Sequence, residues 1–203
     1  MISAITFLSR HVLASCLALA ALMLVPFAAG FAQPVPTGTT ITVTTLVDEL
    51  DASAAPGLGA GTSLREAVTY SVSGDRIVFD AGLTGTVFLS LGEIAFAHDQ
   101  ILEGPGASTI EINGNDLSRI FNVNTGVALD LSGLTLASGR AVDGAAIYSE
   151  GWLSVSASAL RWSTAIQRGG AIFHDGDTLR LTNSRFEHCE SYLHGGAVAV
   201  SGG

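Results

Sequence analysis

A glycine-rich tetrapeptide recurs three times in the second half of this 203-residue chain, at intervals of 25 and 26 residues. Its copies are Gly144-Ala145-Ala146-Ile147, Gly169-Gly170-Ala171-Ile172 and Gly195-Gly196-Ala197-Val198. Two further series of short alternating segments keep step with it: Leu129-Asp130-Leu131, Leu153-Ser154-Val155 and Leu179-Arg180-Leu181, and Ser132-Gly133-Leu134-Thr135-Leu136, Ser158-Ala159-Leu160-Arg161-Trp162 and Ser184-Arg185-Phe186-Glu187-His188. Three strand-like series with one period are typical of a solenoid, in which each repeat packs only against its neighbours.

The period predicts an all-β fold, a parallel β-helix with rungs of about 25 residues. Each strand would pair with its counterpart one rung away, at about 4.8 Å, and alternate side chains would point into one apolar interior. We expect Leu134, Leu160 and Phe186 to stack there, and Trp162 to end the strand of Leu160. The glycines suit tight corners with positive φ. Leucine-rich repeats are the alternative solenoid, but their Leu-x-x-Leu-x-Leu-x-x-Asn pattern is missing.

Residues 40–75 are predicted to cap the first rung. The alternation of apolar and β-branched residues over 40–47 predicts a strand. Ser63-Leu64-Arg65-Glu66 is a capping box, in which the serine accepts from a backbone N–H and the glutamate reaches back to the cap. We therefore expect a short amphipathic helix at 63–72, and no other helix of that length after the leader.

The β-helix itself is predicted over residues 76–203. The last Gly-Gly-Ala-Val segment begins a new rung just before the sequence ends. Open strand edges invite association. We therefore expect this end to need further rungs or a partner, as in a fragment of a longer solenoid.

Residues 1–32 have the pattern of a secretory signal peptide, and residues 33–39 that of a linker. A long uncharged apolar run ends in small residues at Gly30 and Ala32, which suits cleavage after Ala32. An uncleaved membrane anchor is the alternative, because about 20 apolar residues can span a bilayer. Cleavage would leave Cys189 as the only cysteine, so no internal disulfide is expected.

Composition excludes several classes of protein. Charged residues make up 13% of the chain, hydrophobic residues 48%, and the net charge is −9. All nine basic residues are arginine. This balance argues against nucleic acid and against an anionic membrane surface as partners. Two cysteines build neither a disulfide scaffold nor a structural zinc site.

Two acidic or histidine-containing segments are the candidates for metal chemistry. Asp175-Gly176-Asp177 would supply two carboxylates to a Ca²⁺ site, which needs six to eight oxygen ligands, but such acids in a turn are more often simply solvated. His188 and His194, with Glu187 and Glu190 between them, would have to converge to bind zinc. Strand alternation and an intervening turn oppose that convergence.

Several aromatic and basic residues are candidate sugar-binding groups. Trp152, Trp162 and Tyr192 offer flat apolar surfaces for stacking, with core or corner packing as the alternative. The arginines that form a possible basic stripe are Arg140, Arg161, Arg168, Arg180 and Arg185, and interleaved acids favour a mixed outer surface. No hydrolase, metalloprotease, phosphate-loop or Cys-x-x-Cys motif is present. We assign no catalytic, cofactor-binding or metal-ligating residue and expect no cofactor.

Several segments resemble the CSLREA domain of bacterial surface proteins. They are Thr62-Ser63-Leu64-Arg65-Glu66-Ala67-Val68, residues 77–86, Gly104-Pro105-Gly106-Ala107, Ile112-Asn113-Gly114-Asn115 and Arg119-Ile120-Phe121. The Gly-Gly-Ala-Ile repeats are similar to those of polymorphic outer-membrane, autotransporter-like proteins. The chain departs from the family where Thr62 replaces its cysteine. The resemblance implies an exported, surface-associated right-handed parallel β-helix and carries no catalytic motif.

The sequence therefore predicts a secreted or cell-surface module with a structural or adhesin-like role. Its partner would be a polysaccharide, a host surface or another surface protein, with no membrane insertion after cleavage of the leader. A pectate-lyase-like polysaccharide lyase or hydrolase is the first alternative, and a non-functional fragment of a larger surface protein is the second. An enzyme should place three or more acids, or an arginine, in register on one sheet.

Overall fold

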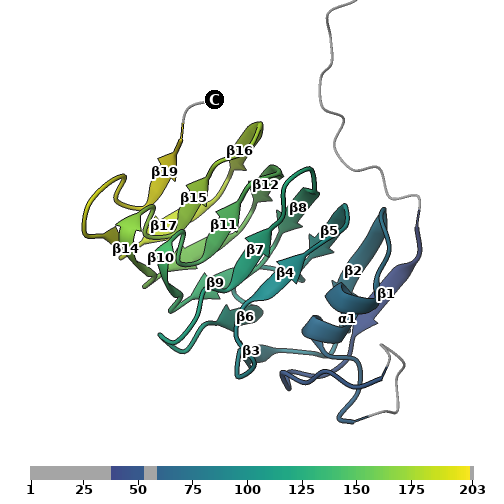
Figure 1. Cartoon of the computed structure of the whole chain (residues 1–203). Coiled ribbons are helices and arrows are strands. Elements are labelled where there is room, and N and C mark those ends of the chain that lie inside the picture. The colour runs from purple at the N-terminus through teal and green to yellow at the C-terminus, as the bar shows by residue number, and fades with distance from the viewer. Residues whose placement is uncertain (1–37, 53–58, 202–203) are drawn as a thin grey trace, which may run out of the picture. The chain divides into compact units, whose positions relative to one another are not determined.

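The computed structural model describes residues 38–52 and 59–201, which form a parallel β-solenoid of about five coils (Figure 1). Every strand pairing in these ranges is parallel, and most connect strands one coil apart. The all-β solenoid predicted from the repeat is confirmed. The predicted signal peptide of residues 1–32, and the linker as far as residue 37, lie outside the described residues.

Three sheets run along the solenoid and a fourth is confined to its later coils. The first contains, in spatial order, β1 (Thr40–Val43), β2 (Asp75–Phe79), β5 (Gln100–Glu103), β8 (Ala128–Ser132), β12 (Trp152–Ser156) and β16 (Thr178–Thr182). The second contains β3 (Gly85–Phe88), β6 (Ile110–Asn113), β9 (Thr135–Ala137), β13 (Ala159–Arg161) and β17 (Arg185–Glu187). The third contains β4 (Ile94–Phe96), β7 (Phe121–Val123), β11 (Ile147–Ser149), β15 (Ile172–His174) and β19 (Val198–Val200).

The fourth sheet corrects the expectation of three strands in every rung. It contains β10 (Arg140–Asp143), β14 (Thr164–Arg168) and β18 (Glu190–Ser191), which lie between the second and third sheets in the chain. The β10 and β14 pairing has an irregular register between Ala141 and Asp143. The repeat pattern predicts no strand series at these positions, because their apolar alternation is short.

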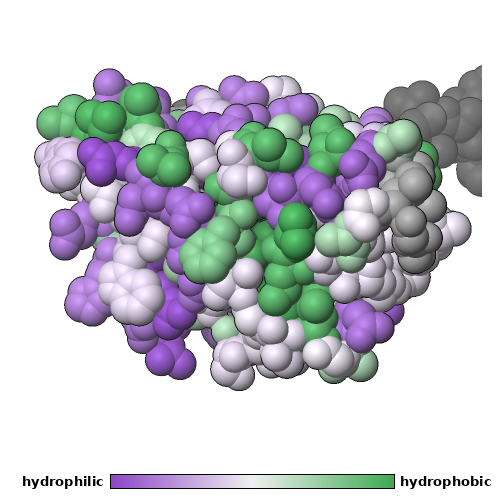
Figure 2. All heavy atoms as spheres, turned by 90° about the horizontal axis from the view of Figure 1, so that it is seen from below, coloured by the Kyte–Doolittle hydropathy of each residue, from purple (hydrophilic) through white to green (hydrophobic). Residues whose placement is uncertain are grey.

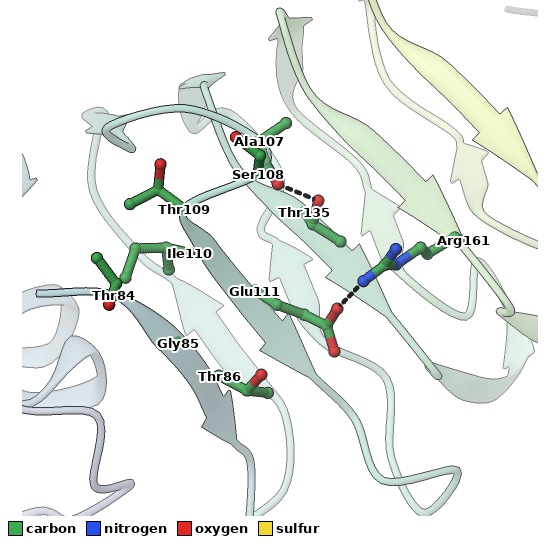
Figure 3. Close-up of a pocket in the computed structure, with 10 residues that line it drawn as sticks. All are labelled: Thr84, Gly85, Thr86, Ala107, Ser108, Thr109, Ile110, Glu111, Thr135 and Arg161. Atoms are coloured by element: carbon green, nitrogen blue, oxygen red, sulfur yellow. Dashed lines mark hydrogen bonds and ion pairs between the residues drawn. The ribbon is translucent and has the colours of Figure 1, made fainter.

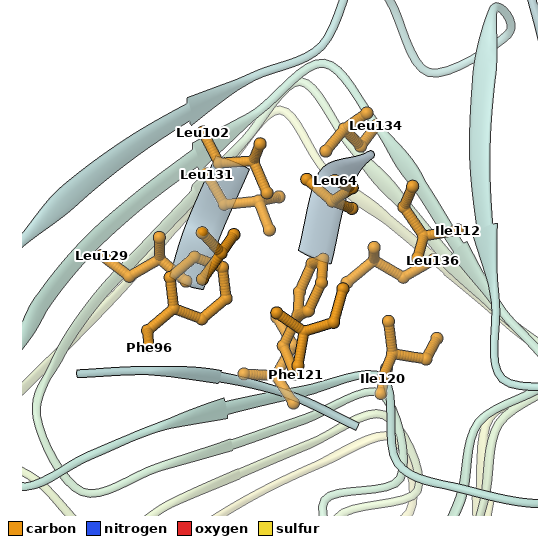
Figure 4. Close-up of a cluster of buried hydrophobic side chains, with 14 of the residues drawn as sticks. Leu64, Phe96, Leu102, Ile112, Ile120, Phe121, Leu129, Leu131, Leu134 and Leu136 are labelled. Atoms are coloured by element: carbon orange, nitrogen blue, oxygen red, sulfur yellow. The ribbon is translucent and has the colours of Figure 1, made fainter. Parts of the chain in front are cut away.

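Apolar side chains stack in columns inside the solenoid. The column of the second sheet contains Val87, Ile112, Leu136, Leu160 and Phe186, which are register partners from coil to coil. Each of the first four is at most 1% exposed. Full burial of one such side chain contributes about 1.5–3 kcal/mol, so the columns are the main source of stability. Figure 4 shows residues of different sheets converging in this interior.

One register prediction was wrong by two residues. Leu160 pairs with Phe186 as expected, but its partner in the preceding coil is Leu136, not Leu134. Leu134 is also fully buried and belongs to the core, at the corner before β9. Leu134 and Leu136 are two residues apart, so the alternation of a strand assigns both to the inward side. The alternation therefore could not show which of them pairs with Leu160.

Left-handed residues turn the chain at equivalent corners of successive coils. Between the first and second sheets these residues are Gly133, Ala157 and Asn183, with φ of 66°, 47° and 49°. After the second sheet they are Ser138, Trp162 and His188. Trp162 is therefore a corner residue outside β13, and 49% of its surface is exposed. The glycines before the Ala-Ile segments also have positive φ, at 55°, 60° and 81° for Gly144, Gly169 and Gly195, as predicted.

The helix α1 (Leu64–Tyr70) lies at the β1 and β2 end of the solenoid (Figure 1). The capping box is present: Glu66 N–H donates to Ser63 Oγ at 3.1 Å, and Ser63 N–H donates to Glu66 at 2.8 Å. Leu64, Ala67 and Val68 join the apolar core. The helix is shorter than the expected 63–72, and the strand expected at 40–47 ends at Val43.

We expect Ala157→Asn to stabilise the protein, because alanine at a left-handed φ costs about 1–2 kcal/mol and asparagine tolerates this conformation. Asn183 and Gly133 occupy the equivalent corners, and Ala157 is exposed. A gain of about 1 kcal/mol should raise Tm by roughly 2–4 °C, measured by thermal melting. Ala159→Asn, within β13, is the control and should bring no gain. An unchanged or lower Tm for Ala157→Asn would contradict the corner assignment.

Candidate functional site

A groove of about 600 Å³ lies on the outer face of the second sheet (Figure 3). Its lining is dominated by small polar residues from β3, β6 and β9 and from the two segments that lead into β3 and β6. The lining residues are Thr84, Gly85, Thr86, Ala107, Ser108, Thr109, Ile110, Glu111, Thr135 and Arg161. This volume falls within the range of small-molecule sites, about 300–1,000 Å³.

Strand alternation places the polar side chains of the groove outside. In β6, Ile110 and Ile112 are buried, so Glu111 between them faces outward. The register pairs Thr86 with Glu111 and Glu111 with Thr135. These three positions therefore form one outward row across three coils. Ser108 and Thr109, which come directly before β6, extend the hydroxyl surface at one edge of the row (Figure 3).

Glu111 and Arg161 carry the only charges in the lining, and they pair with each other. Arg161 Nη2 donates to Glu111 Oε2 across two coils (Figure 3). The other carboxylate oxygen accepts from Asn113 Nδ2 at 2.8 Å. The side chains are only 17% and 33% exposed, so solvent screens the pair less than an open surface pair. Glu111 is thus held on both oxygens.

Arg161 is restrained from a second side by Trp162. Its guanidinium carbon lies 4.5 Å from the centroid of the Trp162 ring, a cation–π contact. Its Nε is buried and has no hydrogen-bond partner. At the floor of the groove, Thr135 Oγ1 donates to the Ala107 carbonyl at 2.6 Å. The groove therefore presents a fixed Glu111 and Arg161 pair, with hydroxyl-bearing residues around it, to a polar ligand.

The groove has a lining unsuited to two-carboxylate hydrolysis. Glycoside hydrolases use a pair of carboxyl groups about 5–9.5 Å apart. Glu111 is the one carboxylate among the lining residues. The prediction that assigned no catalytic residue is not tested by this arrangement, but the chemistry that the groove supports best is binding.

The candidate metal ligands are not brought together. Among residues 38–52 and 59–201, no group of three or more histidine, cysteine or acidic side chains is arranged to hold a metal ion. Asp175 accepts from Ser201 Oγ in the next coil. His188 is a corner residue, whereas His194 forms a β-bridge with Arg168. The zinc and calcium hypotheses therefore have no geometric support.

The three candidate aromatic residues lie in different environments. Trp152 begins β12 and is only 8% exposed, so its ring is packed against the protein and is not open for sugar stacking. Trp162 borders the groove through Arg161, and Tyr192 is 68% exposed beyond β18. The candidate arginines are also dispersed: Arg161 and Arg185 lie on the second sheet, Arg140 and Arg168 on the fourth and Arg180 on the first. They do not form a basic stripe.

Sequence reasoning missed the aromatic pair on the third sheet. Tyr148 and Phe173 are outward register partners, with ring centroids 5.5 Å apart. Arg119 lies over Tyr148, and Arg168 lies 3.9 Å from the Phe173 centroid. Burial and the neighbouring Glu150 raise the pKa of the Tyr148 hydroxyl. The chain's own arginines thus cover this pair, which favours a packing role.

Sequence reasoning also missed the groove residues Thr86, Glu111 and Thr135. Each is an ordinary outward residue of its strand, separated by 24 or 25 residues from the next. Aligning the Thr-x-Phe, Glu-x-Asn and Thr-x-Ala segments of successive strands is the signal that would have found the row.

The segment that carries the CSLREA resemblance holds the capped end together. Arg65 donates from Nε and Nη2 to Asp48, at 2.7 and 3.1 Å, and both side chains are buried. Asp48 also accepts from the backbone N–H groups of Ser90 and Leu91. Glu66 accepts from Asp51 N–H in addition to its capping contact. These residues therefore have structural roles.

Comparisons with protein-family models, curated proteins and solved structures found no match to this chain. In the part of the chain that the structure describes, no helix has both the length and the apolar character needed to cross a membrane.

Arg65→Met should destabilise the protein by about 3–5 kcal/mol, because it leaves the buried Asp48 carboxylate without its cation. Arg76→Met is the matched control: its partner Glu103 is 42% exposed, so its loss should cost less than about 1 kcal/mol. Urea unfolding of both variants measures the difference. Equal losses would show that Arg65 does not hold the cap.

Proposed function

We propose that this protein is a non-catalytic, polysaccharide-contacting surface module of the CSLREA-like, right-handed β-helix type. The observation that carries the proposal is the groove on the second sheet, with its hydroxyl-bearing lining residues and a paired glutamate and arginine. Hydroxyl, carboxylate and guanidinium groups held on rigid strands complement the hydroxyl groups of sugars. A right-handed coil is expected because parallel strand connections are right-handed in about 98% of cases.

A protein partner is less well suited to the groove than a glycan. Protein interfaces concentrate their binding energy in buried aromatic and apolar anchors. Five of the ten lining residues instead carry hydroxyl groups, and Ile110 points into the core. Trp162 is an exposed aromatic residue at the Arg161 corner of the groove. A sugar chain lying across neighbouring coils could contact the row and this ring together.

The proposed location is beyond the cytoplasmic membrane: extracellular, at the cell surface or outer membrane, or in the periplasm. This rests on the signal-like leader and on the resemblance of the capped end. The net charge of −9 supports a partner other than nucleic acid. The face seen in Figure 2 mixes hydrophilic and hydrophobic residues, with hydrophobic residues gathered near its middle, so contacts with neighbouring surface proteins are compatible with the same role.

Affinity electrophoresis of the purified protein in gels containing soluble polysaccharides tests this function. We expect retardation by at least one polymer, reduced at least fivefold by Thr86→Trp, which fills the groove. Thr182→Trp, on the outer face of the first sheet, is the matched control and should retain binding. The same polymers should release no reducing or unsaturated sugar. No retardation by any polymer would overturn the binding proposal, and sugar release would favour the lyase or hydrolase alternative.

A further inference from the structure

The charge arrangement in the groove indicates which polysaccharides it would take. Arg161 is the only cation in the lining, and Glu111 is the only anion. Because Arg161 and Glu111 form an ion pair, the lining of the groove has no net charge. An acidic sugar would approach the Glu111 carboxylate without gaining a free guanidinium, and the chain around it has a net charge of −9. A neutral sugar incurs neither penalty.

We infer that the Glu111 and Arg161 pair makes the groove selective for neutral over acidic polysaccharides. This inference rests on the proposed function. Glu111 is the specificity-determining residue, since it engages the guanidinium that would otherwise receive a sugar carboxylate. Asn113 donates a hydrogen bond to the second carboxylate oxygen of Glu111. Both oxygens are therefore engaged, and the carboxylate stays on Arg161. Trp162 keeps Arg161 over the same corner when the carboxylate is removed.

Glu111→Gln tests the inference by freeing Arg161 with almost no change in shape. We expect the native protein to bind a neutral polymer such as a soluble glucan or galactan and to bind polygalacturonate at least tenfold more weakly. The variant should gain at least tenfold for polygalacturonate at low salt and lose that gain at high salt, where charges are screened. Binding of the neutral polymer should change less than threefold.

Glu103→Gln is the matched control, because it removes the partner of Arg76 on the first sheet with the same change in net charge. It should gain no affinity for polygalacturonate. Equal binding of neutral and acidic polymers by the native protein, or a Glu111→Gln variant that gains nothing, would overturn the selectivity. Failure of the native protein to bind any polymer would instead overturn the proposed function.

A separate observation concerns a histidine in the interior of the third sheet. The second inward column of this sheet contains Phe96, Val123, Ser149, His174 and Val200. Phe96, Val123 and Ser149 are fully buried, and His174 is 1% exposed. Neither ring nitrogen of His174 has a hydrogen-bond partner, nor does Ser149 Oγ. Such groups are costly in a core, and a charged imidazolium would be costlier still.

We propose that His174 makes the coils around β15 to β19 open in acid. The register partners of His174, Ser149 on β11 and Val200 on β19, carry no titratable group. Asp175 and Asp177 in the turn that follows favour the protonated imidazole. Burial outweighs them and lowers the pKa of His174 below its ordinary value of about 6.5. The unfolded chain therefore binds a proton more readily than the folded one.

Because the pKa of His174 is lower in the folded than in the unfolded chain, acid destabilises the folded state. Stability is complete above pH 6.5 and falls as the pH drops from there toward the folded pKa, by up to tenfold in the folding equilibrium for each pH unit. The strands that contact His174 through its register partners are β11 and β19, so a charged imidazolium acts first on the coils around it.

Hydrogen exchange of the full chain at pH 7.5, 6.5 and 5.5, corrected for intrinsic rates, tests this proposal. Protection in β15 to β19 should fall severalfold between pH 6.5 and 5.5, while protection in β2 to β7 stays constant. His174→Phe and His174→Val introduce the side chains that Phe96 and Val123 have at equivalent positions of earlier coils. In either variant that folds, protection of β15 to β19 should no longer decrease between pH 6.5 and 5.5. His188→Phe, at an exposed corner, is the control and should retain it. Persistence of the acid effect in a folded His174 variant would overturn the proposal.

Discussion

Parallel pairing of each strand with its counterpart one coil away is the constraint on which the rest of the structure depends. From β2 onward it places residues that are 24 to 29 apart in the chain directly above one another. An apolar residue at an inward position therefore contacts the apolar residue at the same position of the next coil. The apolar columns follow directly from the repeat of the sequence. Because differences in coil length are absorbed at the corners, the register of the strands is preserved even though the spacing varies.

The same constraint explains how much of the fold could be predicted. The Leu-x-Leu segments, the glycine corners and the capping box are local patterns, and each was found where expected. The choice between Leu134 and Leu136 was not local. Both are buried, and the positive φ at Gly133 sets which of them enters the strand. Fourth-sheet strands such as β10 were missed for a similar reason, because segments of two to five residues show too little alternation.

The groove could not be predicted from any single segment. Glu111 and Arg161 are 50 residues apart, and each is an unremarkable outward residue of its own strand. Only stacking of the coils brings them together, with Thr135 beneath them. In contrast, Ser63, Arg65 and Glu66 are adjacent in the sequence and easily recognised, yet their side chains are fully engaged in the buried contacts of the cap. The most recognisable segment is therefore structural, and the candidate site is made of common residues.

Contacts between neighbouring coils also determine how such a module would respond to a pulling force. The buried Asp48 and Arg65 network ties the capped end to the loop at Ser90 and Leu91. The other coils are held chiefly by parallel strand pairing and by their apolar columns. Under tension these coils would detach one at a time. Each would release about 25 residues, or roughly 80–90 Å of extended chain. A surface protein built in this way would lengthen in steps and dissipate mechanical work while its capped end stayed folded.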